Sequence, residues 1–499
     1  MFAKILAWVR DWITKMLGQN TLKQALGVDV AVSAPMAEAL QLWTLLYQNQ
    51  APWLSADVRS LNLAAAIAGE IARAVTIEMT VDVSGSARAE FLDEQLEYIT
   101  PRLRQNVEYG CAKGGLMLKP YITPNRKIAV DYVQADQFYP VSFDANGRIT
   151  ACVFSDQRKI GQYWFTRLEY HTLTPEGAMI SNAAFRSGSQ GELGQSVPLT
   201  SVDAWAALSD QPATITGADR LLVGYFKFPQ ANSTDPTSPL GVSCYARAAM
   251  GNECLLKQAD KQWSRLLWEF ESGERALYVD VLAFGKDDAG KPLLPNKRLY
   301  RTLNQGGSVG DDALFKDWTP TFRETNILAG LDAILKKVEF NCGLAYGTIS
   351  DPNVIAATAT EIKMQKQRSY ATITDTQKAL QAALDDLLYA MNVWADAFGL
   401  APAGAWEASY EFDDSIVADH DTAFAQDQQV VTMNAMPKYA FLMRNYGMSE
   451  EDARKWVEEA KNESPAPMDF FGQSTALVDN GQGNQEETQP AEEPAAQVE

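Results

Sequence analysis

The feature that most constrains the fold is an uninterrupted run, residues 358–398, which contains neither glycine nor proline. Thr358 and Glu361 have the spacing of a capping box, so a helix should begin there. From Leu380 onward the apolar residues recur every three or four positions and trace one face of a helix. A helix of about 40 residues extends for roughly 60 Å and needs packing along its flank, because isolated helices are marginal in water. We expect the polar first half of this helix to line a solvent-filled space in part, and its second half to be buried.

The length and charge of the chain bound what it can be. At 499 residues it exceeds a single hydrophobic core, so roughly two to four structural units are expected. A formal charge of −20 argues against a protein that binds nucleic acid through attraction between its net charge and the phosphates. The five cysteines form no C-x-x-C pair, which argues against structural zinc and favours free, mostly buried thiols in a reducing cytosol.

Residues 1–17 combine an apolar face with charges at Lys4, Arg10, Asp11 and Lys15. These charges interrupt any signal-peptide core, and the stretch is too short to span a membrane. One interpretation is a membrane-surface anchor. We favour the other, a helix that docks on its own protein or on a neighbouring subunit.

The rest of the chain alternates helical and β-rich regions. Short alternating runs over residues 116–228 predict antiparallel strands joined by hairpins, with the clearest turn at Asn146-Gly147. A loop or domain boundary is expected at 229–241, and a strand is predicted at 276–284. The helices that we predict before the long run are 36–50, 58–79, 93–109, 243–273 and 323–343, and those after it are 411–434 and 449–460.

The sequence offers little catalytic chemistry. No phosphate-binding G-x-x-x-x-G-K-[ST] loop occurs, so the chain is not a P-loop motor by itself. The two histidines lie in no nucleophile motif. An acidic cluster leaves a divalent-metal site open, but its spacing fits no calcium loop and better suits a helix start. The cluster comprises Asp413, Asp414, Asp419, His420 and Asp421.

A set of strings along the chain carries a family resemblance: QLWTLLYQNQAPWL, SLNLAAAIAGEIARAVTIEM, ADQFYPVSFDANGRI, TATEIKMQKQRSY, YEFDDSIVADHDTAFAQD and MRNYGMSEEDARKWVEEA. They span most of residues 36–460, and none of them is a catalytic signature. In number and order they resemble bacteriophage portal proteins of the long-tailed-phage type, the SPP1-like portal family.

The resemblance implies an α+β, ring-forming protein with long stem and wing helices, a β-rich wing region and a small α/β clip. On this sequence the implied ranges are a wing at 1–242, stem helices at 243–273 and 323–343, a clip at 274–322, a channel loop at 344–357, a long wing helix at 358–398, a crown at 399–470 and a disordered acidic tail at 471–499.

The resemblance also implies a ring of twelve subunits at a capsid vertex of the virion, with double-stranded DNA passing through without sequence specificity. The implied partners are the terminase large subunit, head-completion (adaptor) proteins, the major capsid protein and the scaffold, with assembly in the bacterial host cytoplasm. No membrane, cofactor, metal or catalysis is expected. Two alternatives stay open: another phage head or tail structural scaffold, and a metal-dependent enzyme that uses the acidic cluster.

A channel that lets DNA slide cannot hold many phosphates, because each neutralised phosphate adds about −0.9 to the slope of log affinity against log salt. The channel loop and the start of the next helix present short polar side chains with little capacity to read bases. Lysines beside the loop usually form only the solvated face of a helix, but here they would permit a local DNA contact. The residues expected to face DNA are Thr348, Ser350, Asp351, Asn353, Thr358, Thr360 and Lys363, with Lys336 and Lys337 as further basic candidates.

Overall fold

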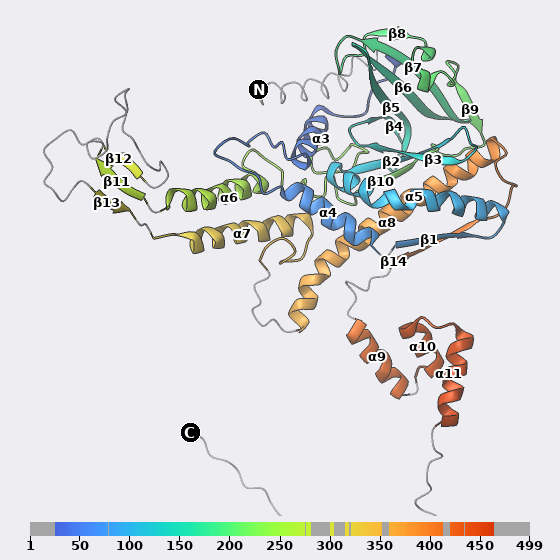
Figure 1. Ribbon diagram of the computed structural model, residues 1–499. Coiled ribbons are helices and arrows are strands. Elements are labelled where there is room, and N and C mark those ends of the chain that lie inside the picture. Colours follow the sequence, from blue (N-terminus) through green and yellow to red (C-terminus); the bar gives the residue numbers. More distant parts are fainter. Residues whose placement is uncertain are drawn as a thin grey trace, which may run out of the picture. The chain divides into compact units, whose positions relative to one another are not determined.

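The computed structural model (Figure 1) describes residues 25–77, 79–274, 276–280, 300–303, 315–318, 321–351, 359–412, 420–433 and 435–463. The expectations for residues 1–17 and 471–499 lie outside this part of the chain, as does the predicted capping residue Thr358. The chain divides into two compact units, Met1–Val417 and Ala418–Glu499. All five cysteines are buried and free, as predicted. Within the described residues, no helix is long and apolar enough to cross a membrane.

Helices and sheets alternate along the first unit. Its α-helices are α3 (Ala34–Tyr47), α4 (Leu63–Thr76), α5 (Ala87–Lys113), α6 (Leu255–Ser272), α7 (Glu324–Cys342) and α8 (Ala359–Ala397). Its strands are β1 (Met79–Ser84), β2 (Gly115–Ile122), β3 (Ile128–Gln134), β4 (Phe138–Phe143), β5 (Ile149–Ile160), β6 (Tyr163–Thr174), β7 (Gly177–Ser187), β8 (Gln195–Val197), β9 (Ala213–Thr216), β10 (Gly224–Lys227), β11 (Ala276–Asp280), β12 (Tyr300–Leu303), β13 (Phe315–Trp318) and β14 (Glu407–Phe412). The second unit contains α9 (His420–Thr432), α10 (Lys438–Tyr446) and α11 (Glu450–Glu463). This mixture of helix and sheet is the predicted α+β class.

The strands pair into separate sheets. The largest has the order β4-β5-β6-β7-β8, with β9 also on β7, and the others are β10-β2-β3, β1-β14 and β12-β11-β13. Within the largest sheet every pair is antiparallel, which confirms the predicted hairpins. At the predicted turn, Gly147 has a φ of 77° and its N–H donates to the carbonyl oxygen of Asp144 at 3.0 Å. Glycine suits this position because it tolerates a positive φ.

Helix α8 organises the first unit as its sequence pattern predicts. Leu380, Leu387 and Met391 on its second half are fully buried, and the helix packs against β10, β2 and α4. In β10, Gly224 allows the strand backbone to approach the helix, since an added Cβ would lie 2.2 Å from the carbonyl oxygen of Ala383. The long helix is therefore built into the core along its second half.

Helix α6 is shorter than the predicted helix over 243–273, because it begins at Leu255. The preceding residues form turns, and Gly251 has a φ of 87°. Tyr245 in these turns is fully buried, and its hydroxyl donates to the carbonyl oxygen of Trp43 at 2.8 Å. The prediction of one long helix was wrong here because the apolar residues before α6 fill the core from turns.

The helix predicted over 58–79 is also shortened at its start. Asn62 adopts a φ of 57°, so α4 begins only at the next residue. The chain ahead of it is held by α6 instead, where the carboxylate of Asp260 accepts from the backbone N–H of Leu61 at 2.8 Å. This contact joins residues far apart in the sequence, so the local sequence around residue 61 could not predict it.

Strand β14 corrects the start of the helix predicted over 411–434, and it lies within the range expected for the crown, 399–470. The strand instead pairs antiparallel with β1 in the first unit, and the second unit begins at Ala418. Ala408 and Tyr410 alternate with polar residues, which is the two-residue period of a strand that the prediction overlooked. Strand β14 therefore belongs to the body that contains α8.

The second unit is a small group of helices. Helices α9 and α11 lie where helices were predicted, and the turn between α10 and α11 passes through Gly447 with a φ of 64°. The rings of Phe424 and Phe441 have centroids 5.3 Å apart. Ala453 of α11 is fully buried.

Candidate functional site

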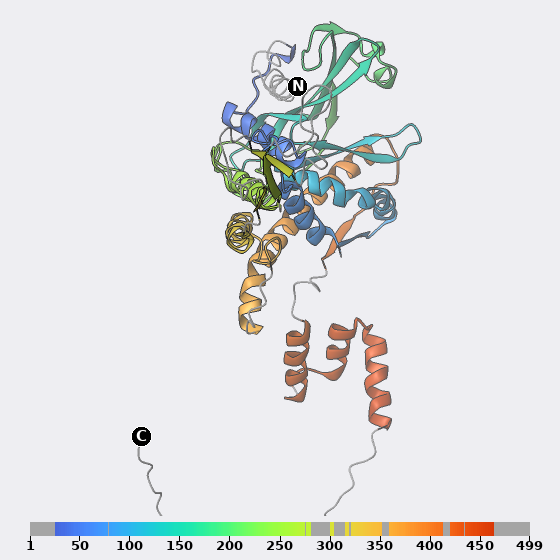
Figure 2. The ribbon, with the colours of Figure 1, turned by 60° about the vertical axis from the view of Figure 1, so that its left-hand side comes forward.

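Helices α6 and α7 run side by side in opposite directions. The side chain of Gln262 on α6 donates to the carbonyl oxygen of Ile327 on α7 at 3.0 Å. Nearer the far end of the pair, Arg323 contacts Glu269 at 2.7 Å, and its hydrogen bond holds the pKa of that carboxyl below its usual value. Figures 1 and 2 show the small β12-β11-β13 sheet next to this end. The described residues of the expected clip thus form a sheet, with β11 at the predicted strand and no helix among them.

Helix α7 ends in a tight turn against α8. Gly343 has a φ of 73°, and the N–H of Leu344 donates back to the carbonyl oxygen of Glu339 at 2.9 Å. This is the Schellman pattern, in which glycine takes the left-handed position. An added Cβ on Gly343 would lie 2.4 Å from the hydroxyl of Thr372, and that hydroxyl donates to the glycine carbonyl at 2.8 Å. Only glycine satisfies both the positive φ and the close approach.

The segment after this turn, residues 344–351, is called the loop base. On one side it is held by α8, where the hydroxyl of Ser369 accepts from the N–H of Ala345 at 2.7 Å. Next to it, Arg368 donates to the carbonyl oxygen of Phe340 at 2.9 Å, and its guanidinium lies 3.9 Å from the centre of the Phe340 ring. The first contact fixes the start of the loop base, and the second fixes the end of α7.

On the other side, the loop base is held by Glu339 of α7, whose side chain is fully buried. One carboxylate oxygen accepts from the N–H of Ile349 at 2.6 Å and of Ser350 at 2.8 Å. The other accepts from the hydroxyl of Ser350 at 2.8 Å and from the N–H of Gly347 at 3.3 Å. Burial, and then the charge of Glu339, raise the pKa of the nearby Cys342 thiol to about 12. Four donors directed at one carboxylate suit its ionised form, which only accepts hydrogen bonds.

The loop base divides the residues that were expected to face DNA. Thr348 and Asp351 are exposed, and the Thr348 hydroxyl donates to the carbonyl oxygen of Ala345 at 2.8 Å. Ser350 is only 4% exposed and bonds to Glu339, so within this chain it does not face a channel. The expectation for Ser350 was wrong because its small polar side chain meets a buried carboxylate rather than solvent.

The other candidate residues lie on α7 or have side chains outside the described part of the chain. Lys337 is exposed, whereas Lys336 pairs with Asp332 at 2.7 Å. Residues whose side chains lie outside the described part of the chain are Asn353, Thr358, Thr360 and Lys363.

Glu339 is the residue that the sequence analysis missed. Its signal was present, because it lies among Leu335, Val338 and Cys342 on the apolar face of α7. A charged residue on such a face must find partners when the face is buried. The identity of those partners could not be inferred, since they lie beyond the end of the helix.

The acidic cluster gains no support as a metal site. The backbones of Asp413, Asp414 and Asp419 lie outside the described residues, as do the side chains of His420 and Asp421. Among the side chains that the structure describes, no group of three or more His, Cys, Asp or Glu could hold a metal ion.

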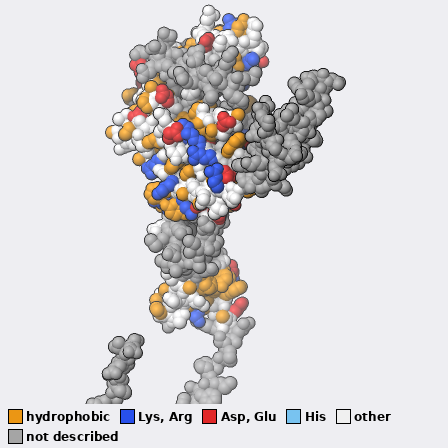
Figure 3. Space-filling view, turned by 90° about the vertical axis from the view of Figure 1, so that its left-hand side faces the viewer, with side chains coloured by type: hydrophobic (Ala, Val, Ile, Leu, Met, Phe, Trp, Pro, Cys, Tyr) orange, Lys and Arg blue, Asp and Glu red, His pale blue; other side chains and the backbone are white. Residues whose placement is uncertain are grey.

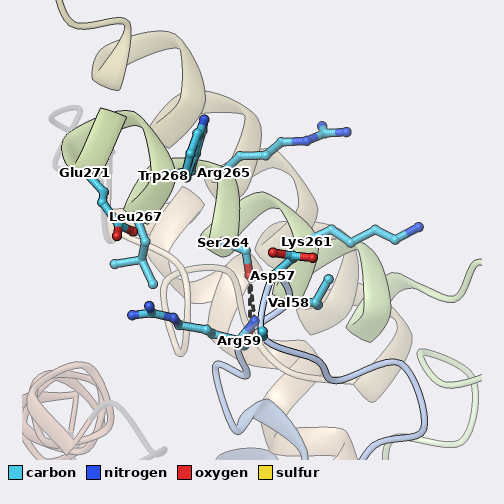
Figure 4. A pocket seen from close by; sticks show the side chains of 10 residues that line it. Asp57, Val58, Arg59, Lys261, Ser264, Arg265, Leu267, Trp268 and Glu271 are labelled. Atoms are coloured by element: carbon cyan, nitrogen blue, oxygen red, sulfur yellow. Dashed lines mark hydrogen bonds between the residues drawn. The ribbon is translucent and has the colours of Figure 1, made fainter. Parts of the chain in front are cut away.

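A surface hollow of about 610 Å³ lies between α6 and the chain at residues 56–59 (Figure 4). The hydroxyl of Ser264 accepts from the N–H of Arg59 at 2.8 Å and fixes that segment on α6. Trp268 at the rim is 65% exposed. Lys261 also lines the hollow and pairs with Glu253 at 2.8 Å. Lys and Arg side chains gather beside apolar ones on the face seen in Figure 3.

Comparisons with known proteins agree with the family resemblance. The chain has no match among curated proteins. A matching solved structure, "Neck of native GTA particle computed with C12 symmetry", is 12% identical with a TM-score of 0.41 over 88% of this chain and 98% of the other. A similarity at that level carries no functional information. The model of the family described as "Phage portal protein, SPP1 Gp6-like" matches residues 76–466, and the chain therefore belongs to this family of phage portal proteins.

Proposed function

We propose that the chain assembles into a ring of twelve identical subunits at the capsid vertex, through which double-stranded DNA enters during packaging and leaves during ejection. The observation that carries this proposal is the portal-family match over residues 76–466. A ring needs a heterologous interface, in which one face of each subunit meets a different face of the next. Assembly takes place in the bacterial cytoplasm, and the product resides in the virion.

Exposed apolar side chains on α6 and α7 support a role for this helix pair in subunit contacts. Trp268 and Phe270 on α6 are 65% and 46% exposed, and Leu328 and Phe340 on α7 are 46% and 48% exposed. Subunit contacts along the pair would remove this apolar surface from water. We assign this pair to the stem of the portal and the small sheet beyond it to the clip.

The partners follow from this assignment. The clip sheet is the proposed docking platform for the terminase large subunit and later for head-completion (adaptor) proteins. The body that contains α8 and the large sheet is the proposed contact with the major capsid protein and the scaffold. The portal family is a structural one, so we propose no catalytic step and no cofactor.

In the channel, the proposed DNA-facing segment starts at the exposed side chains of Thr348 and Asp351 and continues into residues 352–358. The chain's net charge of −20 supports a loosely held duplex. Lys336 is already paired with Asp332 at 2.7 Å, which leaves less positive charge to bind phosphates. Weak phosphate binding favours sliding over retention.

The assembly is tested by sedimentation and negative-stain microscopy of the purified chain. We expect a closed ring of about twelve subunits with a central hole wide enough for duplex DNA. A compact dimer with a cleft would contradict the proposed ring. A defined complex without a central hole would instead favour another head or tail scaffold role.

The role of the loop is tested by replacing residues 352–357 with a glycine–serine linker of equal length. We expect rings to assemble while the heads package or retain less DNA, because the segment that contacts the duplex is lost. The control is the same replacement at the six exposed residues 207–212 of the β-rich region, which should leave packaging unchanged. Normal filling and retention with the 352–357 replacement would show that this segment does not act on DNA.

A further inference from the structure

We propose that Glu339 is the positioning residue of the channel loop, and that its carboxylate fixes the loop base to stem helix α7. The role of the loop on DNA rests on the proposed function, but the contacts of Glu339 are observed independently of that role. The side chain is fully buried although it carries a charge. Burying a carboxylate is costly unless donors surround it, so these contacts are a defined feature of the fold.

The donors come almost entirely from the loop backbone. The N–H groups of Ile349 and Ser350 donate to one carboxylate oxygen at 2.6 and 2.8 Å. The N–H of Gly347 is shared between the other carboxylate oxygen at 3.3 Å and the Ser350 hydroxyl at 3.1 Å. Converging backbone N–H groups form a concave anion-binding nest. In this chain the anion in the nest is supplied by the preceding helix, and the Ser350 hydroxyl adds the fourth donor at 2.8 Å.

Helices α8 and α7 hold different parts of the loop base. From the described residues of α8, the hydroxyl of Ser369 holds the start of the loop base by accepting from the N–H of Ala345 at 2.7 Å. Glu339 holds its later part, which is the part that leads directly into residues 352–358. A force applied to the loop by a moving duplex is therefore passed to α7. At its other end α7 is tied to α6 by Arg323 and Glu269, beside the clip sheet.

The decisive experiment is chemical rescue of Glu339→Ala, read by hydrogen exchange of the amides of Gly347, Ile349 and Ser350. Truncation to alanine removes the atoms of one acetate ion and leaves the nest empty. We expect these amides to exchange about tenfold faster or more in the variant, because their acceptor is lost. Sodium acetate should restore much of the protection, whereas sodium chloride at the same ionic strength should not.

A merely structural defect would not respond to acetate. The matched control is Glu324→Gln, which changes a carboxylate at the opposite end of the same helix and should leave the same three amides protected. Unchanged exchange in Glu339→Ala would overturn the proposal. Equal slowing by acetate in Glu339→Ala and in the control would overturn it as well.

Glu339→Gln keeps the proposal testable if the alanine variant does not fold. The amide keeps the size of the side chain but accepts through only one of its ends, so its nitrogen must face at least one backbone N–H of the nest. We expect intermediate exchange rates at Gly347, Ile349 and Ser350. Exchange identical to that of the unsubstituted chain would show that the carboxylate is not the anchor.

The same variant separates this inference from the proposed function. Faster exchange together with reduced DNA retention in assembled heads supports both the anchor and the DNA-facing loop. Faster exchange with normal packaging and retention supports Glu339 as the anchor of the loop base but contradicts the proposed role of the loop on DNA.

Discussion

Replacing Arg88 with alanine is expected to lower the free energy of unfolding of the first unit by about 3–5 kcal/mol, because several hydrogen bonds are lost and a cavity remains. Arg88 lies at the start of α5 and is 1% exposed. Its guanidinium donates to the carbonyl oxygens of Ala401 at 2.7 Å, Pro402 at 2.9 Å and Asn392 at 3.0 Å. It also contacts the carboxylate of Asp396 at 2.6 Å.

These bonds tie the start of α5 to the end of α8 and to the chain that leads into β14. The ion pair itself contributes little, because the Asp396 side chain is 55% exposed and screened by solvent. The carbonyl bonds carry the larger effect, since the variant would leave carbonyl oxygens in the last turns of α8 and just after it without this donor. Arg88→Lys should recover little of the loss, because one ammonium cannot reach acceptors spread around a planar guanidinium.

Urea unfolding followed by tryptophan fluorescence measures this effect. The control is Arg73→Ala on α4, which removes an exposed pair with Glu70 at 3.3 Å and should change stability by less than about 1 kcal/mol. Equal losses for the two variants would mean that the buried contacts of Arg88 contribute no more than a surface pair.

Replacing Glu169 with glutamine is expected to destabilise the large sheet by about 3–5 kcal/mol at neutral pH, because buried cations lose their counter-charge. On β6, Glu169 accepts from Lys119 at 2.8 Å and from His171 at 2.7 Å, and it forms an ion pair with Arg167 at 3.1 Å. The Lys119 side chain is 7% exposed, and its second partner, Asp131, is more distant at 3.5 Å. The glutamine side chain would be neutral and would leave this lysine poorly compensated.

The effect should depend on pH in a defined direction. Burial by itself raises the pKa of Glu169, but Lys119, His171 and Arg167 outweigh it and hold the pKa well below its usual range. A carboxyl with a depressed pKa in the folded state stabilises the fold above its unfolded pKa of about 4.3 and loses that contribution as the pH falls through the folded value. The difference between the unsubstituted chain and Glu169→Gln should therefore stay constant above about pH 5 and narrow in acid.

Unfolding midpoints measured from neutral to acidic pH test this expectation. The control is Glu176→Gln, at the exposed turn between β6 and β7, which should have little effect at any pH. A difference between Glu169→Gln and the unsubstituted chain that widens in acid would contradict the assigned direction of the pKa shift.

Local signals in the sequence were sufficient for the regular elements. The absence of glycine and proline and the spacing of Leu380, Leu387 and Met391 predicted α8, which extends over Ala359–Ala397. The apolar period likewise predicted α7, and Asn146-Gly147 predicted a hairpin turn. Backbone preference and amphipathic spacing act over a few residues, so they can be read without knowledge of the fold.

Local sequence patterns did not predict the environment of a residue where its burial depended on partners far away in the sequence. The residues before α6 have helical apolar content, yet Tyr245 fills the core beside Trp43 from a turn. Ser350 was predicted to face DNA, but its environment is set by Glu339. Strand β14 was missed although its alternation was visible, because its pairing with β1 joins opposite ends of the unit.

The sequence by itself determined the family, because the segments that resemble portal proteins and their order can be read directly from it. It also determined the mixture of helix and sheet, the long buried helix and the turn positions that require glycine, because these depend on local backbone preference. The tertiary structure alone decided which charged residues are buried. Arg88 donates to the carbonyl oxygen of Pro402, more than 300 positions away, and Glu169 on β6 accepts from Lys119 on β2, a strand of a different sheet. A buried charge is stable only where donors and acceptors converge from separate segments, and that convergence exists only in the folded chain.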